Sequence, residues 1–171
     1  MRKLVAALAC RNMGSRLFGK PLQNLDIDNR KTILGHLVDC ISSVEEVEEI
    51  VLGISEGIEN EVFKQFAQDH GIPHIIGDEE DVLGRLIECG KKTNATDILR
   101  VTSESPFPYV DLIEDSWHNH VQGKFDASFL DGIIQGCGFE ILSMKSLKKS
   151  HREGEDRHRS ELCTLYIREN K

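Results

Sequence analysis

The chain has 171 residues, enough for one domain with a substantial core. Apolar residues make up 39% of it and charged residues 29%, a balance typical of globular proteins, and no apolar run reaches the length of a membrane span. The formal net charge of −8 argues against a nucleic-acid-binding protein. The five cysteines form no CxxC pair, so we expect neither a zinc site nor a disulfide framework, and a cytoplasmic location fits best.

Strand and helix patterns alternate along the chain. A buried first strand is predicted where an apolar run precedes a glycine-bearing loop, and further strands follow at regular intervals: 3–9, 49–54, 72–76, 96–102, 125–130 and 139–143. Apolar residues at helical spacing predict helices at 32–43, 58–70, 79–93 and 110–121. The alternation predicts an α/β protein of three layers, α/β/α, with a mainly parallel sheet covered by helices on both faces.

Some side chains can be placed from these patterns. We expect the following to face the core: Val62, Phe63, Phe66, Ala67, Trp117 and Phe129. Asp78 is the N-cap candidate of the helix at 79–93, whose first turn is acidic and suits the positive end of the helix dipole. The charged run 151–159 is expected to be a solvated helix surface or loop, with His158 exposed.

The loop that follows the first strand carries the clearest functional signal. Residues 11–20 read RNMGSRLFGK, with three cations at spacings of five and four and with two glycines. In an open α/β sheet, ligands bind at the carboxyl ends of the strands, where glycine allows close backbone approach and Arg and Lys bond phosphate oxygens. These residues predict either a phosphate-binding loop or an ordinary basic surface loop, and the Walker A pattern is absent.

Four collinear blocks resemble the cytidylyltransferases that activate sugar acids, a group that includes the 3-deoxy-manno-octulosonate, acylneuraminate and spore-coat polysaccharide enzymes. Residues 11–20 resemble R-x-x-S-x-R-L-P-G-K, and residues 77–85 (GDEEDVLGR) resemble G-S-E-E-D-V-L-x-R. Residues 100–106 (RVTSESP) resemble R-x-T-G-D-x-P, and residues 160–167 (SELCTLYI) resemble R-E-H-V-T-P-Y-I. The resemblance spans nearly the whole chain and implies a nucleotide-diphospho-sugar transferase fold.

The resemblance also implies a reaction and the residues that perform it. An acceptor oxygen would attack the α-phosphorus of CTP, pyrophosphate would leave, and Mg²⁺ would bridge the phosphates. The implied catalytic residues are Arg11, Lys20 and Glu104, and the implied metal ligands are Glu104 and Glu140. The implied nucleotide-binding residues are Cys10, Arg11, Gly14, Ser15, Arg16, Lys20, Ser55, Asp78 and Arg100.

Several positions depart from the family pattern and bear on the chemistry. Glu104 stands where aspartate is usual, and Gly138 stands where the second acidic pair, with Glu140, has its aspartate. Ser160 and Leu162 replace an arginine and a histidine on the acceptor side. Three functions therefore remain open: a Mg-dependent cytidylyltransferase acting on a sugar acid, guanylyl or other nucleotidyl transfer to a sugar phosphate, and a degenerate relative that only binds nucleotide.

The organisation of the chain is expected to be simple. We predict one nucleotidyltransferase domain over residues 1–171, ending where many members of the family continue into a C-terminal tail. By resemblance the protein would form a homodimer, with CTP and a sugar-acid or sugar-phosphate acceptor as its small-molecule partners. No association with nucleic acid or membrane is expected.

Overall fold

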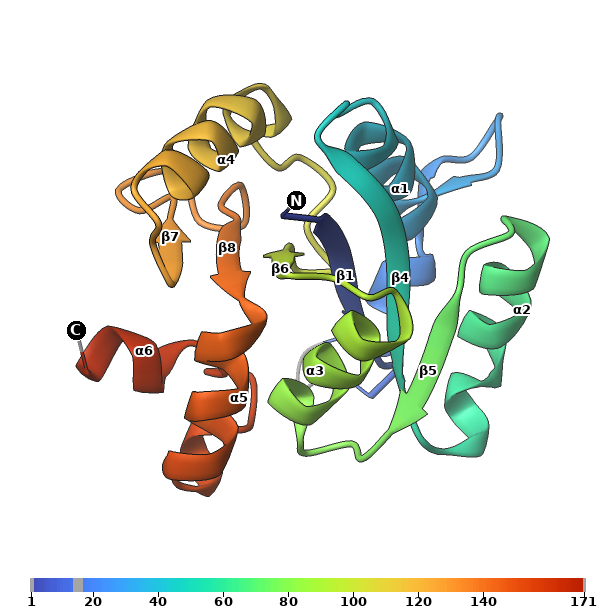
Figure 1. The fold of residues 1–171 in the computed structure, drawn as a ribbon. Helices are drawn as coiled ribbons and strands as arrows, with labels where there is room; N and C mark the ends of the chain where they lie inside the picture. Colours follow the sequence, from blue (N-terminus) through green and yellow to red (C-terminus); the bar gives the residue numbers. More distant parts are fainter. Residues whose placement is uncertain (1, 14–16, 171) are drawn as a thin grey trace.

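A strand buried on both faces organises the fold. In the computed structural model, which describes residues 2–13 and 17–170, the N-terminal apolar run forms β1 (Leu4–Cys10). β1 lies between β4 (Val47–Ser55) and β6 (Asp97–Arg100), and all three strands are parallel. The outer strands are β5 (His74–Gly77), which is parallel to β4, and the antiparallel pair β8 (Glu140–Ser143) and β7 (Ala127–Phe129). The resulting six-stranded sheet has the order β5-β4-β1-β6-β8-β7 (Figure 1).

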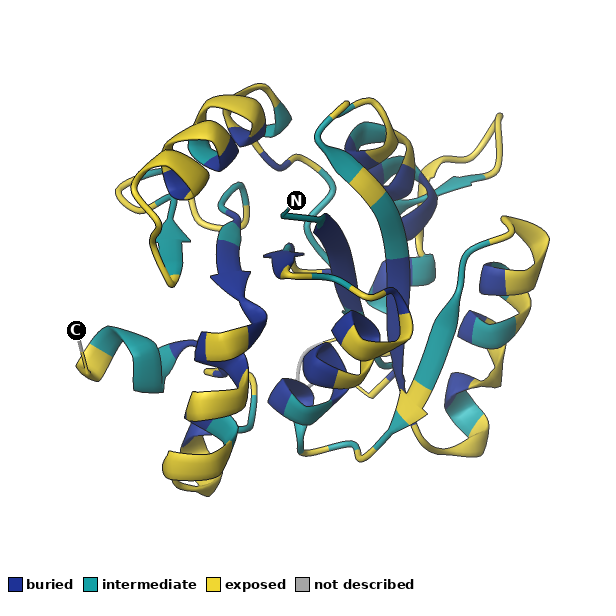
Figure 2. Cartoon of the chain, viewed as in Figure 1, coloured by how far each residue is buried: buried dark blue, intermediate teal, exposed yellow. Residues whose placement is uncertain are grey.

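Helices cover both faces of this sheet. Successive side chains of β1 point to opposite faces, and both sets are apolar, so each face packs against helices. Leu4 and Leu8 pack in one core cluster with α1 (Ile33–Ser42), α2 (Glu61–Asp69) and α4 (Ile113–Gln122). Val5 and Ala7 pack in the other with α3 (Val82–Lys92) and α5 (Met144–Glu153). The buried sheet therefore lies between helices whose outer faces are exposed (Figure 2), which confirms the predicted three-layer α/β/α architecture.

Shorter elements complete the chain. They are the 3-10 turns η1 (Lys20–Leu22), η2 (Ile58–Asn60), η3 (Val110–Leu112) and η4 (Asp156–His158), the hairpin of β2 (Asn24–Asp26) with β3 (Lys31–Thr32), and the terminal helix α6 (Leu165–Glu169). The sequence patterns predicted none of three elements, namely the hairpin, α5 and α6. Over the described residues, no helix has both the length and the apolar character needed to cross a membrane.

Three placements of side chains were wrong. Val62 is 44% exposed, because the inward face of α2 is made by Phe63 and Ala67. α3 begins at Val82, and its N-cap is Asp81, whose side chain accepts from the Gly84 N–H, so Asp78 is not the cap. His158 is buried, since its ring bonds the Glu155 N–H and the Glu169 carboxylate.

Candidate functional site

The loop after β1 is anchored at its first turn. The Asn12 N–H donates to Asn60 Oδ1 at 2.8 Å, and the Asn12 side-chain amide donates to the Glu59 carbonyl. The Gly19 N–H returns to the Asn12 carbonyl at 2.9 Å with φ of +63°, a left-handed conformation that favours glycine. These bonds bring Lys20, the first residue of η1, back toward the end of β1. The predicted site residues Gly14, Ser15 and Arg16 lie outside the described residues.

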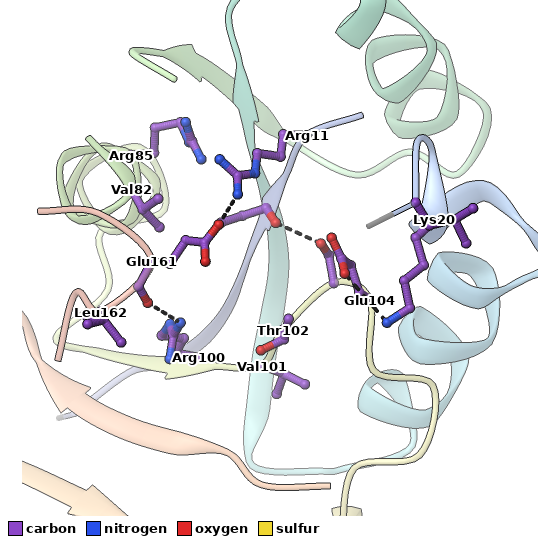
Figure 3. Close-up of a pocket in the computed structure, with 13 residues that line it drawn as sticks. Arg11, Lys20, Val82, Arg85, Arg100, Val101, Thr102, Glu104, Glu161 and Leu162 are labelled. Atoms are coloured by element: carbon purple, nitrogen blue, oxygen red, sulfur yellow. Dashed lines mark hydrogen bonds and ion pairs between the residues drawn. The ribbon is translucent and has the colours of Figure 1, made fainter. Parts of the chain in front are cut away.

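A cavity of about 530 Å³, here called the first cavity, opens along this loop. It lies at the carboxyl ends of β1 and β6, where ligands bind in open α/β sheets. Four predicted site residues are brought together there, namely Arg11, Lys20, Arg100 and Glu104. Figure 3 shows their side chains arranged around the cavity with those of Arg85, Glu161 and Leu162.

Carboxylates lie opposite three of the cations in this group. Lys20 Nζ lies 3.5 Å from Glu104 Oε2, and Arg11 forms an ion pair with Glu161. Arg100 donates from Nη1 to Glu140 Oε2 at 2.6 Å and from Nη2 to the Glu161 carbonyl at 3.2 Å. The first cavity therefore combines cations suited to phosphate oxygens with carboxylates that balance them.

The two predicted metal ligands differ in their fit to a divalent ion. Glu104 lines the first cavity, and its side chain is about one-third exposed, so its oxygens can reach a cation beside a bound phosphate. Glu140 does not fit, because its two oxygens already accept bonds from Arg100, Thr164 and Arg168. Among the described residues, a group with ligand atoms close enough for a metal consists of Glu46, Glu114 and His118, and none of these lines the cavity.

Cys10 and Ser55 lie beneath the site rather than in it. The Cys10 side chain is fully buried in the core, and this burial raises the pKa of its thiol to about 12, so the thiol stays protonated and unreactive. The Ser55 hydroxyl is also buried and donates to the Glu56 carbonyl. Neither residue lines the first cavity or the adjoining one.

Asp78 lies in a second cavity of about 800 Å³ that adjoins the first. The linings of the two cavities share Arg11, Val82, Glu161 and Leu162. The Asp78 carboxylate accepts the N–H groups of Asp81 and Glu80, and these bonds lower the pKa of Asp78. Asp78 is therefore ionised at neutral pH and shapes the turn that precedes α3.

Three residues with clear roles in the site's geometry were missed by the analysis of the sequence. Arg85 lines the first cavity from α3, Asn12 anchors the loop, and Glu161 pairs with Arg11 from 150 positions away. Arg85 and Glu161 stand in two of the four resembling blocks, which was the available signal. Asn12 carried none, because its contact with Asn60 depends on how η2 packs against the loop.

The mainly parallel sheet with helices on both faces is the α/β/α fold of nucleotidyltransferase-type structures. In particular, the structure is similar to that of a cytidylyltransferase from Leptospira borgpetersenii serovar Hardjo-bovis, with a TM-score of 0.90 and 20% identity over 99% of this chain and 72% of that one. It is also similar to a CMP:2-keto-3-deoxy-manno-octonic acid synthetase solved with CTP, with a TM-score of 0.72 and 15% identity over 98% and 86%.

In sequence, the chain is 24% identical over 168 residues to the uncharacterized protein MJ1063 of Methanocaldococcus jannaschii. The aligned region covers 98% of this chain and 68% of that protein. No family model matches the chain. At these identities the similarities establish the fold.

Proposed function

We propose that the protein is a nucleotidyltransferase that transfers CMP from CTP to a sugar acid or a similar acceptor and releases pyrophosphate. The observation that carries this proposal is the first cavity, in which Arg11 and Lys20 follow β1 at the carboxyl edge of the sheet. The four resembling blocks support it, as does the similarity to a synthetase that was solved with CTP.

The residues of the cavity suit the charge changes of this reaction. When an acceptor oxygen attacks the α-phosphorus, negative charge accumulates on the leaving pyrophosphate. Lys20 and Arg11 neutralise that charge from fixed positions, and such electrostatic stabilisation is the main catalytic contribution in phosphoryl-type transfer. A bound Mg²⁺ would add charge neutralisation at the phosphates.

Glu104 is the proposed carboxylate ligand of this ion. Mg²⁺ is commonly held by one or two carboxylates together with substrate phosphates, and Glu140 is engaged by arginines. We therefore propose one metal site that forms only when nucleotide is bound, with Glu104 as its protein ligand. A bound Mg²⁺ would be held by the Glu104 carboxylate, which contacts Lys20 in the free protein.

The test is pyrophosphate release from CTP, UTP, ATP and GTP with a panel of sugar acids and sugar phosphates. We expect release with CTP and a sugar-acid acceptor, and none from an Arg11→Ala/Lys20→Ala double variant. Preference for GTP with a sugar phosphate would instead support guanylyl transfer. Nucleotide binding without release from any pair would contradict the enzyme and support a relative that only binds nucleotide.

A further inference from the structure

Arg85 is a buried cation at the edge of the first cavity. It is only 2% exposed, yet it is among the residues that line the cavity. Its aliphatic part runs past two glycines of the sheet: a Cβ at Gly53 would lie 3.4 Å from Arg85 Cβ, and one at Gly77 would lie 3.0 Å from Arg85 Cγ. A side chain at either position would crowd the stem of Arg85. The two glycines therefore leave room for Arg85 to extend from α3 past the carboxyl ends of β4 and β5.

The guanidinium is incompletely partnered. Nη1 donates to the carbonyl oxygens of Asp78 and Glu79, the latter at 2.9 Å, while the buried Nε has no acceptor. Within the part of the chain that the structure describes, no carboxylate forms an ion pair with Arg85, in contrast to Arg11 and Arg100. Burial lowers the pKa of Arg85, and the positive charge of Arg11 acts in the same direction.

A buried charge without a counter-charge is unfavourable, because burial removes the water that would solvate it. Two carbonyl bonds offset only part of that cost and leave the positive charge without an anion. Arg11 faces the same cavity, and Figure 3 shows its guanidinium and that of Arg85 directed toward one another. Two guanidinium groups placed in this way are suited to an anion between them, because both donate charge-assisted hydrogen bonds.

We propose that Arg85 and Arg11 form an anion subsite that binds a phosphate group of the nucleotide. The proposal rests on the proposed function, because the nucleotide is the anion that this function brings to the cavity. The Glu161 carboxylate, which is largely exposed and pairs with Arg11 in the free protein, yields Arg11 to the phosphate. Arg85 binds the phosphate from α3, while Lys20 lies across the cavity beside Glu104.

The experiment compares wild type with Arg85→Met, which keeps an unbranched stem and removes the charge. Binding of CTP, CMP, cytidine and inorganic pyrophosphate is measured by calorimetry. Lys145→Met is the matched control. It removes one positive charge, as Arg85→Met does, but on the exposed face of α5 and away from both cavities. We expect Arg85→Met to weaken CTP and CMP by roughly ten- to a hundred-fold, with cytidine binding unchanged and the control equal to wild type.

Unchanged CTP affinity in a folded Arg85→Met variant would overturn the subsite, and so would an equal loss of cytidine and CMP binding, which would mean that Arg85 only holds the 78–79 turn. If the variant does not fold, the Arg85 Nε–H resonance of wild type is followed by NMR during titration with pyrophosphate. A shift that saturates supports the subsite, and an unmoved resonance contradicts it.

The two proposals fail in different ways. Binding of pyrophosphate that depends on Arg85, in a protein that never releases pyrophosphate from CTP, would leave the subsite standing and reject nucleotidyl transfer. Turnover that is unaffected by Arg85→Met would support nucleotidyl transfer and reject the subsite.

Discussion

Lys20 and Glu104 contact one another at 3.5 Å, and both side chains are partly exposed. An exposed ion pair of this kind contributes little to folding. Either partner can therefore be replaced with little effect on stability, and the variants report on ligands rather than on folding.

The Lys20→Ala variant should bind CTP more weakly, because a charge-assisted bond to phosphate is lost. We expect a cost of about 1.5–3 kcal/mol in binding free energy, with an unchanged unfolding transition. Calorimetry of CTP binding measures the effect, and Lys145→Ala on the exposed face of α5 serves as control. If the two variants bound CTP equally well, Lys20 would not contact the phosphates.

Replacing Glu104 by Gln should abolish turnover while leaving metal-free nucleotide binding nearly intact. The amide keeps the size of the side chain but removes the charge that holds Mg²⁺. The measurement is pyrophosphate release by wild type and variant across a magnesium titration. Glu88→Gln is the control, since it makes the same change of charge at an exposed position of α3 that lines neither cavity. Equal activity of Glu104→Gln and wild type would contradict the assignment.

At the scale of elements, the turn before α3 shows how one cap decides where a helix begins. Four consecutive acidic residues, 78–81, offer equivalent signals in the sequence. Asp78 accepts the N–H groups of Glu80 and Asp81, which forms a turn, and this leaves Asp81 to cap the helix through the Gly84 N–H at 2.7 Å. Asp81 also bonds His151 of α5 at 2.7 Å, so the cap joins two helices on the same face of the sheet.

The Asp81→Ala variant should lose about 1 kcal/mol of unfolding free energy through the cap, and somewhat more if the His151 contact adds to it. Asp81→Asn is the control, because its amide oxygen still accepts the Gly84 N–H. Urea titrations of both variants measure the difference. If Asn destabilised the protein as much as Ala, the contact with His151 rather than the cap would be responsible.

At the scale of the whole molecule, one buried network joins distant parts of the chain at the amino end of β6. Asp97 is fully buried and bonds Arg2 from the N-terminal segment and His120 from α4. His120 in turn bonds Ser128 of β7 at 2.8 Å. Burial opposes ionisation of Asp97, but hydrogen bonds from His120, Arg2 and Thr96 outweigh it, so the pKa of Asp97 is lowered.

The lowered pKa of Asp97 predicts that the free energy of unfolding falls in acid. A carboxyl whose pKa is lower in the folded state stabilises the protein above its unfolded pKa, and the contribution is lost as pH falls through the folded pKa. The free energy of unfolding, measured in urea between neutral pH and the acid limb, should therefore decline below the ordinary pKa of aspartate.

Asp97→Asn should remove this part of the pH dependence and cost about 1–3 kcal/mol at neutral pH, because the amide is uncharged and one of the two acceptor oxygens is replaced by a donor. Asp39→Asn, which affects an exposed pair with Lys31, is the control and should change little. A variant with the same acid profile as wild type would show that Asp97 does not contribute.

The position of the basic loop was predictable from local pattern. An apolar strand followed by Arg11, Gly19 and Lys20 is a feature of neighbouring residues, and the carboxyl edge of a parallel sheet follows from the alternation of strands and helices. The same holds for the six strands of the main sheet and for α1 to α4, since periods of two and 3.6 residues are local. α5 carries few apolar residues and its pattern was missed.

Tertiary structure decided the partners of the charges. Arg100 and Glu140 are opposite one another because β8 runs antiparallel to β6 in that register, so the expected metal ligand forms an ion pair with an arginine. Arg85 is buried without a counter-charge because α3 packs it against two glycines of the sheet, and Glu161 reaches Arg11 across 150 positions. Local periodicity specifies which face of an element is apolar, but the pairing of charges depends on strand register and helix packing between distant segments, and only the folded chain determines these.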